Sequence, residues 1–233
     1  VMVYLMTGFL DSGKTQFLTF TLEQDYFQIQ GKTLLILCEE GEEEYDPKEM
    51  LKYGVVIEKV EDKEDLTEAW LEEMNRKHKP ERVVVEYNGM WPVSDFEKLA
   101  LPAGWKIEQK IATVDASTFQ MYLTNLKPLF VEMVKGAELV LFNRCEDRGP
   151  LAGYRRSVKV VSPQAEVIFE DENGEVDNIF EDEVPYDLNA PVIEIRREDY
   201  GIWYVDMMDN LDKYVDKTVR FKGQVLKLSL IHI

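Results

Sequence analysis

The sequence predicts an α/β fold: a mostly parallel sheet with helices on both faces, followed by a small, incomplete α+β region at the C-terminal end. Two observations favour this fold class. A short apolar run, a glycine-rich loop and a helical pattern follow one another directly over residues 1–22. Further along the chain, short apolar runs alternate with stretches of helical periodicity, which is the pattern of parallel strands joined by helices.

The first expected element is an apolar strand over residues 1–7, followed at once by the loop Gly-Phe-Leu-Asp-Ser-Gly-Lys-Thr. This loop, residues 8–15, fits the phosphate-binding pattern G-x-x-x-x-G-K-[ST]. Its glycines let the backbone curl so that N–H groups point at phosphate oxygens, and the helix that follows adds the positive end of its dipole. The residues expected to contact nucleotide here are Gly8, Asp11, Ser12, Gly13, Lys14, Thr15 and Gln16.

Two side chains of this loop have specific expected roles. Lys14 should reach the β- and γ-phosphates, which makes it a candidate catalytic residue, and the hydroxyl of Thr15 should bind Mg²⁺. The alternative is a chance match in a glycine turn. The order of strand, loop and helix argues against that alternative.

A second apolar run, residues 33–38, ends in an acidic stretch over residues 39–46. Most of these acids are expected to face solvent in a loop. The stretch nevertheless leaves the carboxyl end of a strand close to the predicted phosphate loop, where open α/β sheets bind ligands. Glu39 and Glu42 are therefore candidate catalytic residues, and Glu39 is also a candidate metal ligand.

The next informative stretch is residues 81–89, in which three valines precede Glu86 and Gly89 follows. An acid at the end of such a strand holds Mg²⁺ in phosphate-loop NTPases, directly or through water. The alternative is a buried strand that ends in an exposed glutamate. With the phosphate loop present, we expect Glu86 to organise Mg²⁺ with Thr15, and the N–H of Gly89 to approach the γ-phosphate.

The remaining elements continue the alternation. Strands are expected at residues 55–57, 111–116, 137–142 and 162–168, and a helix over residues 65–78.

The composition excludes several classes of function. The 45 acidic and 27 basic residues give a formal net charge of -18, which argues against nucleic acid and against anionic lipid as partners. No apolar run approaches the length of a membrane span. The two cysteines, Cys38 and Cys145, lie far apart, so we expect reduced thiols in a cytoplasmic protein.

Several short motifs together resemble the CobW-like GTPases, relatives of the HypB and UreG nickel-insertion GTPases. The residues that carry the resemblance extend over about residues 1–171 and comprise the phosphate loop with its preceding threonine (7–15), C-E-E-G-E (38–42), E-Y-N-G (86–89), T-V-D-A (113–116), N-R-C-E (143–146) and S-P-Q-A (162–165).

This resemblance implies GTP as the bound nucleotide and hydrolysis coupled to metal handling. It places Asn143 against the guanine ring, Arg144 over the base and Glu146 as the acceptor for the guanine N1 and N2 donors. Asp147 could take the last role if the loop is shifted by one residue. Ser162 joins these candidates, and the segment around Glu39 and Glu42 would position the attacking water. A client protein or metal-uptake partner and a nucleotide-dependent dimer are further expectations.

The sequence departs from the family pattern at four places. Asp11 replaces a glycine, which the loop can accommodate because aspartate tolerates positive φ better than most residues. Cys38 replaces an asparagine and Asn88 replaces a hydroxyl residue. The C-x-C-C metal motif of the family is absent after Met50, so the sequence does not support metal transfer by cysteine thiolates.

The expected domain organisation is a GTPase domain over residues 1–175, an acidic linker over 176–190 and a small C-terminal region over 191–233. In that region we expect a helix at 203–211 and a strand at 214–225. This strand resembles the first strand of a small barrel. A barrel cannot close on one strand, so we expect the region to be truncated or to pair elsewhere.

Two rival functions remain open at this stage. An ATP-dependent ATPase or kinase is one, because the guanine motif is degenerate. A nucleotide-binding scaffold that has lost turnover and acts through partner proteins is the other.

Overall fold

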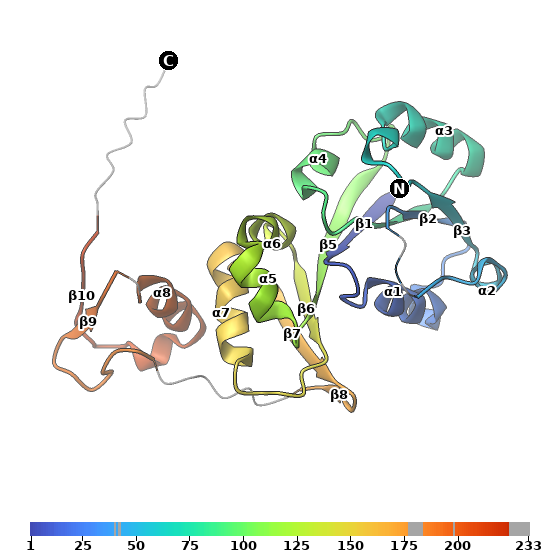
Figure 1. Ribbon diagram of the computed structural model, residues 1–233. Helices are drawn as coiled ribbons and strands as arrows, with labels where there is room; N and C mark the ends of the chain where they lie inside the picture. The colour runs from blue at the N-terminus through green and yellow to red at the C-terminus, as the bar shows by residue number, and fades with distance from the viewer. Residues whose placement is uncertain (40, 42, 177–183, 198, 224–233) are drawn as a thin grey trace, which may run out of the picture.

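The computed structural model describes residues 1–39, 41, 43–176, 184–197 and 199–223 (Figure 1). Its main sheet has eight strands in the order β3-β2-β4-β1-β5-β6-β7-β8. Strands β1 to β7 run parallel, and β8 pairs antiparallel with β7. The strands are β1 (Met2–Gly8), β2 (Thr33–Leu37), β3 (Val55–Lys59), β4 (Arg82–Glu86), β5 (Lys106–Asp115), β6 (Leu139–Asn143), β7 (Glu166–Asp171) and β8 (Gly174–Glu175).

Helices cover both faces of this sheet, which confirms the predicted fold class. They are α1 (Lys14–Glu23), α2 (Pro47–Lys52), α3 (Glu68–His78), α4 (Val93–Glu97), α5 (Phe119–Asn125), α6 (Lys127–Val134) and α7 (Leu151–Val161). Short 3₁₀ helices occur at Asp25–Phe27 and Lys63–Asp65. In Figure 1, α5, α6 and α7 lie together beside β5, β6 and β7, and α1 lies on the other side of the sheet.

The alternation of side chains along β1 shows which helices share a face. Leu5 packs in a cluster with residues of α3 and α4, whereas the next residue, Met6, packs with residues of α1. Thr7 points to the same face as Leu5 and pairs with Ala112 of β5, which packs against α5, α6 and α7. Helices α3 to α7 therefore cover one face, and α1 and α2 cover the other.

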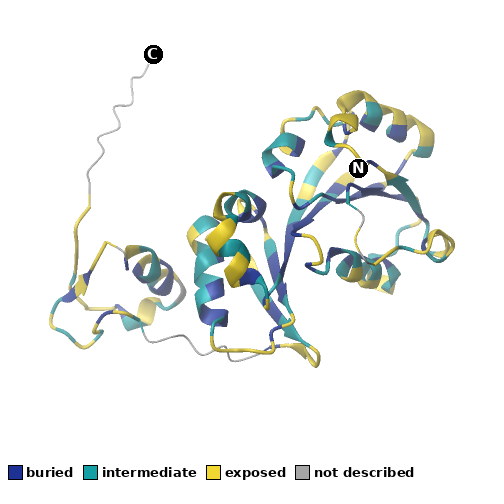
Figure 2. Ribbon diagram, in the orientation of Figure 1, coloured by how far each residue is buried: buried dark blue, intermediate teal, exposed yellow. Residues whose placement is uncertain are grey.

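Burial explains why the central strands read as continuous apolar runs. Every residue of β2 and of β4 is buried, because a parallel sheet with helices on both faces hides both sides of its strands (Figure 2). The carboxyl ends of β1, β4 and β2 are neighbours in this order of strands. Residues that follow these three strands are therefore brought to one edge of the sheet.

One predicted strand begins later than the sequence indicated. The expected strand at 162–168 is β7, Glu166–Asp171, and α7 remains helical as far as Val161. Val158 holds this end of the helix in the core, where it is fully buried. Residues 162–165 form the turn between α7 and β7, where Pro163 has no N–H to donate to a neighbouring strand.

The C-terminal part contains a two-stranded parallel sheet, β9 (Ile193–Ile195) and β10 (Val219–Phe221), with helix α8 (Tyr200–Asp209) and a 3₁₀ helix at Leu211–Lys213. Its core is the cluster of Tyr186, Ile193, Ile195, Trp203 and Tyr214. The helix expected at 203–211 is α8. The strand expected at 214–225 is shorter, and residues 224–233 lie outside the described part of the chain.

The predicted linker is only partly described, since residues 177–183 are not. Val176 at its start packs in the core against the main sheet, and Tyr186 packs in the core of the C-terminal part. The division into residues 1–175, 176–190 and 191–233 stays a prediction.

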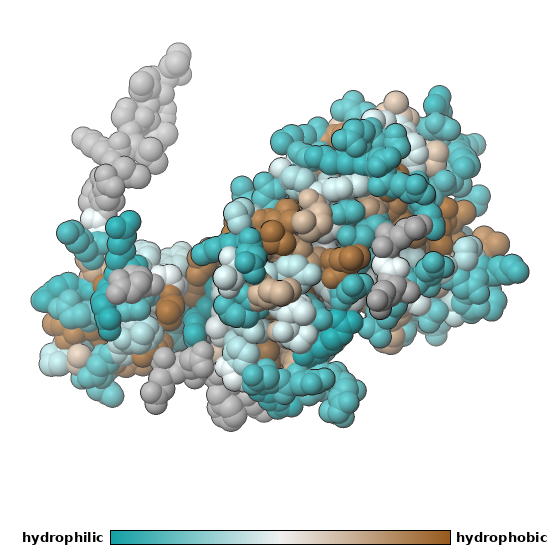
Figure 3. All heavy atoms as spheres, in the orientation of Figure 1, coloured by the Kyte–Doolittle hydropathy of each residue, from teal (hydrophilic) through white to brown (hydrophobic). Residues whose placement is uncertain are grey.

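The surface is predominantly hydrophilic on the face shown in Figure 3. In the described ranges, no helix is both long enough and apolar enough to cross a membrane.

Candidate functional site

The loop between β1 and α1 has a shape that its glycines make accessible. Gly8 has φ 150° and Gly13 has φ 85°. A Cβ at Gly8 would lie 2.6 Å from the carbonyl oxygen of Thr113, so no larger residue fits without moving the backbone. Asp11 has φ 57°, the left-handed conformation that aspartate tolerates, so the loop keeps its form despite the lost glycine.

Hydrogen bonds from the neighbouring strands hold this loop in place. The hydroxyls of Ser12 and Thr113 lie 2.8 Å apart, and Nδ2 of Asn143 donates to the carbonyl of Ser12 at 2.8 Å. Arg144 donates to the carbonyl of Asp11 at 2.8 Å. These hydrogen bonds fix the loop to β5 and to the end of β6, directly before the start of α1.

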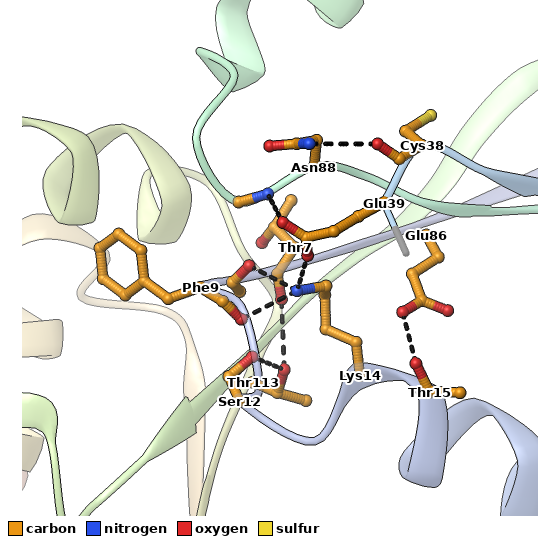
Figure 4. Close-up of polar contacts among 12 residues, drawn as sticks. Thr7, Phe9, Ser12, Lys14, Thr15, Cys38, Glu39, Glu86, Asn88 and Thr113 are labelled. Atoms are coloured by element: carbon orange, nitrogen blue, oxygen red, sulfur yellow. Dashed lines mark hydrogen bonds and ion pairs between the residues drawn. The ribbon is translucent and has the colours of Figure 1, made fainter. Parts of the chain in front are cut away.

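Lys14 lies inside the loop and is 3% exposed at its side chain. Its Nζ donates to the carbonyls of Gly8 and Phe9, both at 2.8 Å, and pairs with Oε2 of Glu39 at 2.5 Å (Figure 4). A buried ammonium group needs such partners, because its desolvation is otherwise costly. The structure thus brings together the predicted residues Lys14 and Glu39.

Glu86, at the end of β4, connects this strand to the phosphate loop. Its Oε1 accepts a 2.8 Å hydrogen bond from the hydroxyl of Thr15, the second residue of α1 (Figure 4). Burial raises the pKa of the Glu86 carboxyl above its usual value, although the hydrogen bonds it accepts act in the opposite direction. The oxygen atoms of a hydroxyl and a carboxylate at this place are suitable ligands for Mg²⁺ in a nucleotide site.

Tyr45 is a site residue that the sequence analysis missed. Its hydroxyl donates a 2.5 Å hydrogen bond to Oε2 of Glu86. Burial and the nearby charge of Glu86 raise the pKa of Tyr45, so this hydroxyl stays protonated. The available signal was its position as the one aromatic residue of the acidic stretch, next to Asp46, whose carboxylate caps the start of α2.

Gly89 and Asn88 form the turn after β4. A Cβ at Gly89 would lie 2.2 Å from the carbonyl oxygen of Gly8, so the turn packs directly on the phosphate loop. The N–H of Gly89 donates to Oε1 of Glu39 at 3.4 Å. Asn88 donates to the carbonyl of Cys38 at 3.2 Å, which joins the ends of β4 and β2.

These groups enclose a small cavity of about 90 Å³. Binding sites for small molecules are typically several hundred Å³, so the cavity is too small for a whole nucleotide in this state. The residues that line it are Leu10, Asp11, Gly13, Lys14, Thr15, Glu39, Gly41, Glu43, Glu86 and Arg144.

Comparison with known proteins agrees with this geometry. The family model described as "CobW/HypB/UreG, nucleotide-binding domain" matches residues 2–169. The chain belongs to the CobW/HypB/UreG family. No match was found among curated proteins.

Two solved structures are similar in fold to this chain. The hydrogenase maturation factor HypB from Archaeoglobus fulgidus is 18% identical, with a TM-score of 0.52; the match covers 74% of this chain and 82% of that one. The Zn(II)-bound YjiA GTPase from E. coli is 22% identical, with a TM-score of 0.54, over 76% of this chain. The match spans 59% of the YjiA chain.

The residues that the family resemblance assigns to the base are less completely assembled than those around the phosphates. Asn143 reaches the phosphate loop, and its Oδ1 is buried without a partner in the described structure. Nη1 of Arg144 donates to Oδ2 of Asp115 at 2.5 Å, in addition to its contact with the carbonyl of Asp11. Glu146 and Asp147 are exposed, and Asp147 accepts a hydrogen bond from the N–H of Gly149 at 3.0 Å.

The other three predicted residues differ in where they lie. Ser162 precedes β7 at the opposite edge of the sheet, where its hydroxyl donates to the carbonyl of Val134 at 2.9 Å and accepts from the N–H of Gly136 at 2.8 Å. Gln16 lies in the first turn of α1 with an exposed side chain. Glu42 lies outside the described residues.

Neither cysteine of this family member is exposed. Burial, followed by the charges of Glu86 and Glu39, raises the pKa of Cys38, and burial raises the pKa of Cys145 to about 11. Among the residues that the structure describes, no group of three or more His, Cys, Asp or Glu side chains is placed to hold a metal ion.

Proposed function

We propose that this nucleotide-binding domain binds GTP with Mg²⁺ at the loop between β1 and α1 and hydrolyses the γ-phosphate. The observation that carries the proposal is the 2.8 Å hydrogen bond between the hydroxyl of Thr15 and Oε1 of Glu86. It places a hydroxyl and a carboxylate side by side at the start of α1, next to Lys14. A phosphate-loop NTPase needs these three groups at this place.

Each residue then has a defined task. The N–H groups of the loop and the ammonium of Lys14 hold the phosphates, and the start of α1 adds favourable electrostatics. Thr15 and Glu86 hold Mg²⁺, which neutralises charge on the phosphate oxygens when bound. We assign the orientation of the attacking water to the acidic segment after β2, which contains Glu39 and Glu42.

The test is a calorimetric titration of the chain with GTP, GDP and ATP, with and without Mg²⁺, followed by a steady-state assay of phosphate release. GTP binding that tightens with Mg²⁺, together with phosphate release, is the expected result. Binding without phosphate release would support the scaffold function instead. No binding of any nucleotide would contradict the proposal.

An ATP-dependent function is the second candidate. It is favoured by the arrangement of the residues that the resemblance assigns to the base. Arg144 bonds to Asp11 and Asp115, and Glu146 is exposed. The charged groups that would recognise guanine are therefore not gathered around a pocket in this state. Equal affinity for ATP and GTP in the titration would favour this candidate.

We also propose that the chain acts on a client protein or a metal-uptake partner, and that nucleotide binding controls a dimer. The family match and the net charge of -18, which suits a basic partner surface, support this proposal. The raised pKa values of Cys38 and Cys145 keep both as thiols at neutral pH, so we assign no metal transfer to them. Light scattering with GDP and with a GTP analogue tests the dimer.

A further inference from the structure

Lys14 already has three partners in the structure. Its Nζ donates to the carbonyls of Gly8 and Phe9 and lies 2.5 Å from Oε2 of Glu39. An ammonium group has three N–H donors, so these contacts occupy all of them. The side chains of Lys14 and Glu39 are 3% and 9% exposed, and solvent therefore screens their interaction little.

The second oxygen of the same carboxylate faces the turn after β4. Oε1 of Glu39 accepts from the N–H of Gly89 at 3.4 Å (Figure 4). Gly89 packs against the backbone of Gly8, because a Cβ there would lie 2.2 Å from its carbonyl oxygen. The carboxylate thus bridges the ammonium of Lys14 and the N–H of Gly89. In the proposed function, these are the two donors that face the γ-phosphate.

We propose that the carboxylate of Glu39 occupies the γ-phosphate position in the nucleotide-free protein, and that Glu39 thereby sets the preference between nucleoside diphosphates and triphosphates. The inference rests on the proposed function. A carboxylate and a terminal phosphate are both anions that present oxygens to the same donors, so the two exclude each other. A triphosphate must displace Glu39 from both Lys14 and Gly89, whereas a diphosphate reaches only Lys14 and leaves the contact with Gly89 in place.

The surroundings strengthen this competition. The cavity of about 90 Å³ beside Lys14 is also lined by Asp11, Glu43 and Glu86. A γ-phosphate added there meets negative charge on several sides, and the charge of Glu39 is the one paired directly with Lys14. Hydrogen bonds in which the donor or the acceptor is ionised are about twice as strong as neutral ones, so the charge of Glu39 strengthens its contacts with Lys14 and Gly89. Removing the charge of Glu39 therefore favours the triphosphate more than the diphosphate.

Glu39→Gln is the decisive variant, because it keeps the shape of the side chain and removes its charge. Glu44→Gln is the matched control: Glu44 is an exposed acid in the same acidic stretch, and its replacement changes the net charge equally. Calorimetry would give the Kd of the parent and of both variants for GDP and for a β,γ-imido analogue of GTP at fixed Mg²⁺ and salt. The ADP and ATP counterparts would be measured in parallel.

Glu39→Gln should shift the ratio of triphosphate to diphosphate affinity toward the triphosphate by about tenfold, the size of one charge-assisted contact. Glu44→Gln should change this ratio less than about twofold, since exposed charges are screened. An unchanged ratio in Glu39→Gln, or an equal shift in both variants, would overturn the inference. Nucleotide binding itself would then still support the proposed function, whereas no binding by the parent would contradict that function.

A kinetic measurement on the parent needs no substitution and covers the case in which Glu39→Gln does not fold. In stopped-flow mixing with fluorescent GDP and with the fluorescent β,γ-imido analogue, the triphosphate should associate about fivefold or more slowly, because displacement of Glu39 precedes its binding. Equal association rates for the two nucleotides would then overturn the inference.

Discussion

The hydroxyl of Tyr45 and the hydroxyl of Thr15 bind the two oxygens of the Glu86 carboxylate, at 2.5 Å and 2.8 Å. Glu86 is buried, and burial raises its pKa. Without these donors its ionised form would lack hydrogen bonds in a site closed to most solvent. Tyr45 therefore stabilises the empty site through Oε2, the carboxylate oxygen that does not accept from Thr15.

The first prediction concerns this contact. Tyr45→Phe should lower the free energy of unfolding of the nucleotide-free protein by about 1.5–3 kcal/mol, since a hydrogen bond to a charged group contributes that much. Urea denaturation measures the change. Tyr26→Phe is the control, because Tyr26 is 77% exposed. Equal stability of the two variants would show that the Tyr45 hydroxyl contributes nothing to the empty site.

The second prediction concerns Lys14. Lys14→Ala should weaken triphosphate binding by about two orders of magnitude or more, because it removes the cation that faces the terminal phosphates. The change also has a cost in stability, since it leaves Glu39 without its ion-pair partner and the carbonyls of Gly8 and Phe9 without a donor. Circular dichroism and calorimetry measure fold and binding separately; parent-like affinity would exclude Lys14 from the site.

The third prediction concerns Glu86. Glu86→Gln keeps the shape of the side chain but replaces one accepting oxygen by an amide nitrogen that donates, and it removes the charge that would hold Mg²⁺. Mg²⁺ should then enhance nucleotide affinity by about tenfold less than in the parent, and turnover should fall. Titrations at a series of Mg²⁺ concentrations measure this effect. If nucleotide affinity depends on the Mg²⁺ concentration in the same way in parent and variant, Glu86 is not a ligand of the metal.

The fourth prediction is a pH dependence at Asp115. Burial alone would raise the pKa of Asp115, but hydrogen bonds from Ser117 and Arg144 outweigh it and hold the pKa below its ordinary value. A lowered pKa means that this group stabilises the protein above the pKa of the unfolded chain. That contribution is lost as the pH falls through the folded pKa.

Asp115→Asn should therefore destabilise the protein at pH 7, and the difference from the parent should shrink below about pH 4. The expected loss is about 1 kcal/mol or less, because the Arg144 side chain is 45% exposed and solvent screens the pair. Thermal unfolding at several pH values measures it, with Asp25→Asn as a control at an exposed aspartate. A difference that grows toward low pH would contradict the assigned sign.

Much of the fold and of the phosphate site could be predicted because their determinants are local. The spacing of Gly8, Gly13 and Lys14 fixes a loop shape between a strand and a helix, and the valines before Glu86 mark a buried strand. The whole pattern extends over a few neighbouring residues, so it is readable without knowledge of the tertiary structure.

The contacts that close the site could not be predicted in the same way. Tyr45 and Glu86 are 41 residues apart, and Glu39 and Gly89 are 50 residues apart. These pairs meet because β2 lies beside β4, and that order of strands arises from the crossovers of the chain rather than from any short motif. Ser162 was assigned to the site only through the resemblance of S-P-Q-A to a family motif. In the structure it precedes β7, at the edge of the sheet opposite the phosphate loop, and its hydroxyl donates to the carbonyl of Val134.

The last prediction concerns the choice of base. Guanine presents donors at N1 and N2, whereas adenine presents an acceptor at N1, so a carboxylate accepts from guanine and repels adenine. Glu146 is exposed and can turn toward a bound base, whereas Asp147 already accepts from the N–H of Gly149. A charge-assisted hydrogen bond contributes about 1.5–3 kcal/mol, which corresponds to a preference for GTP over ATP of about one to two orders of magnitude.

Glu146→Ala should collapse that preference and leave phosphate affinity unchanged, because Lys14 and Thr15 are untouched. Asp147→Ala tests a shift of the motif by one residue; it should loosen the turn at Gly149 but keep the preference. Competition titrations with GTP and ATP measure the ratio for the parent and both variants. If the parent binds the two nucleotides with equal affinity, or if both variants keep the parent ratio, neither carboxylate recognises guanine. The ATP-dependent function then accounts better for a site in which Arg144 is held by Asp115 and Glu146 remains in solvent.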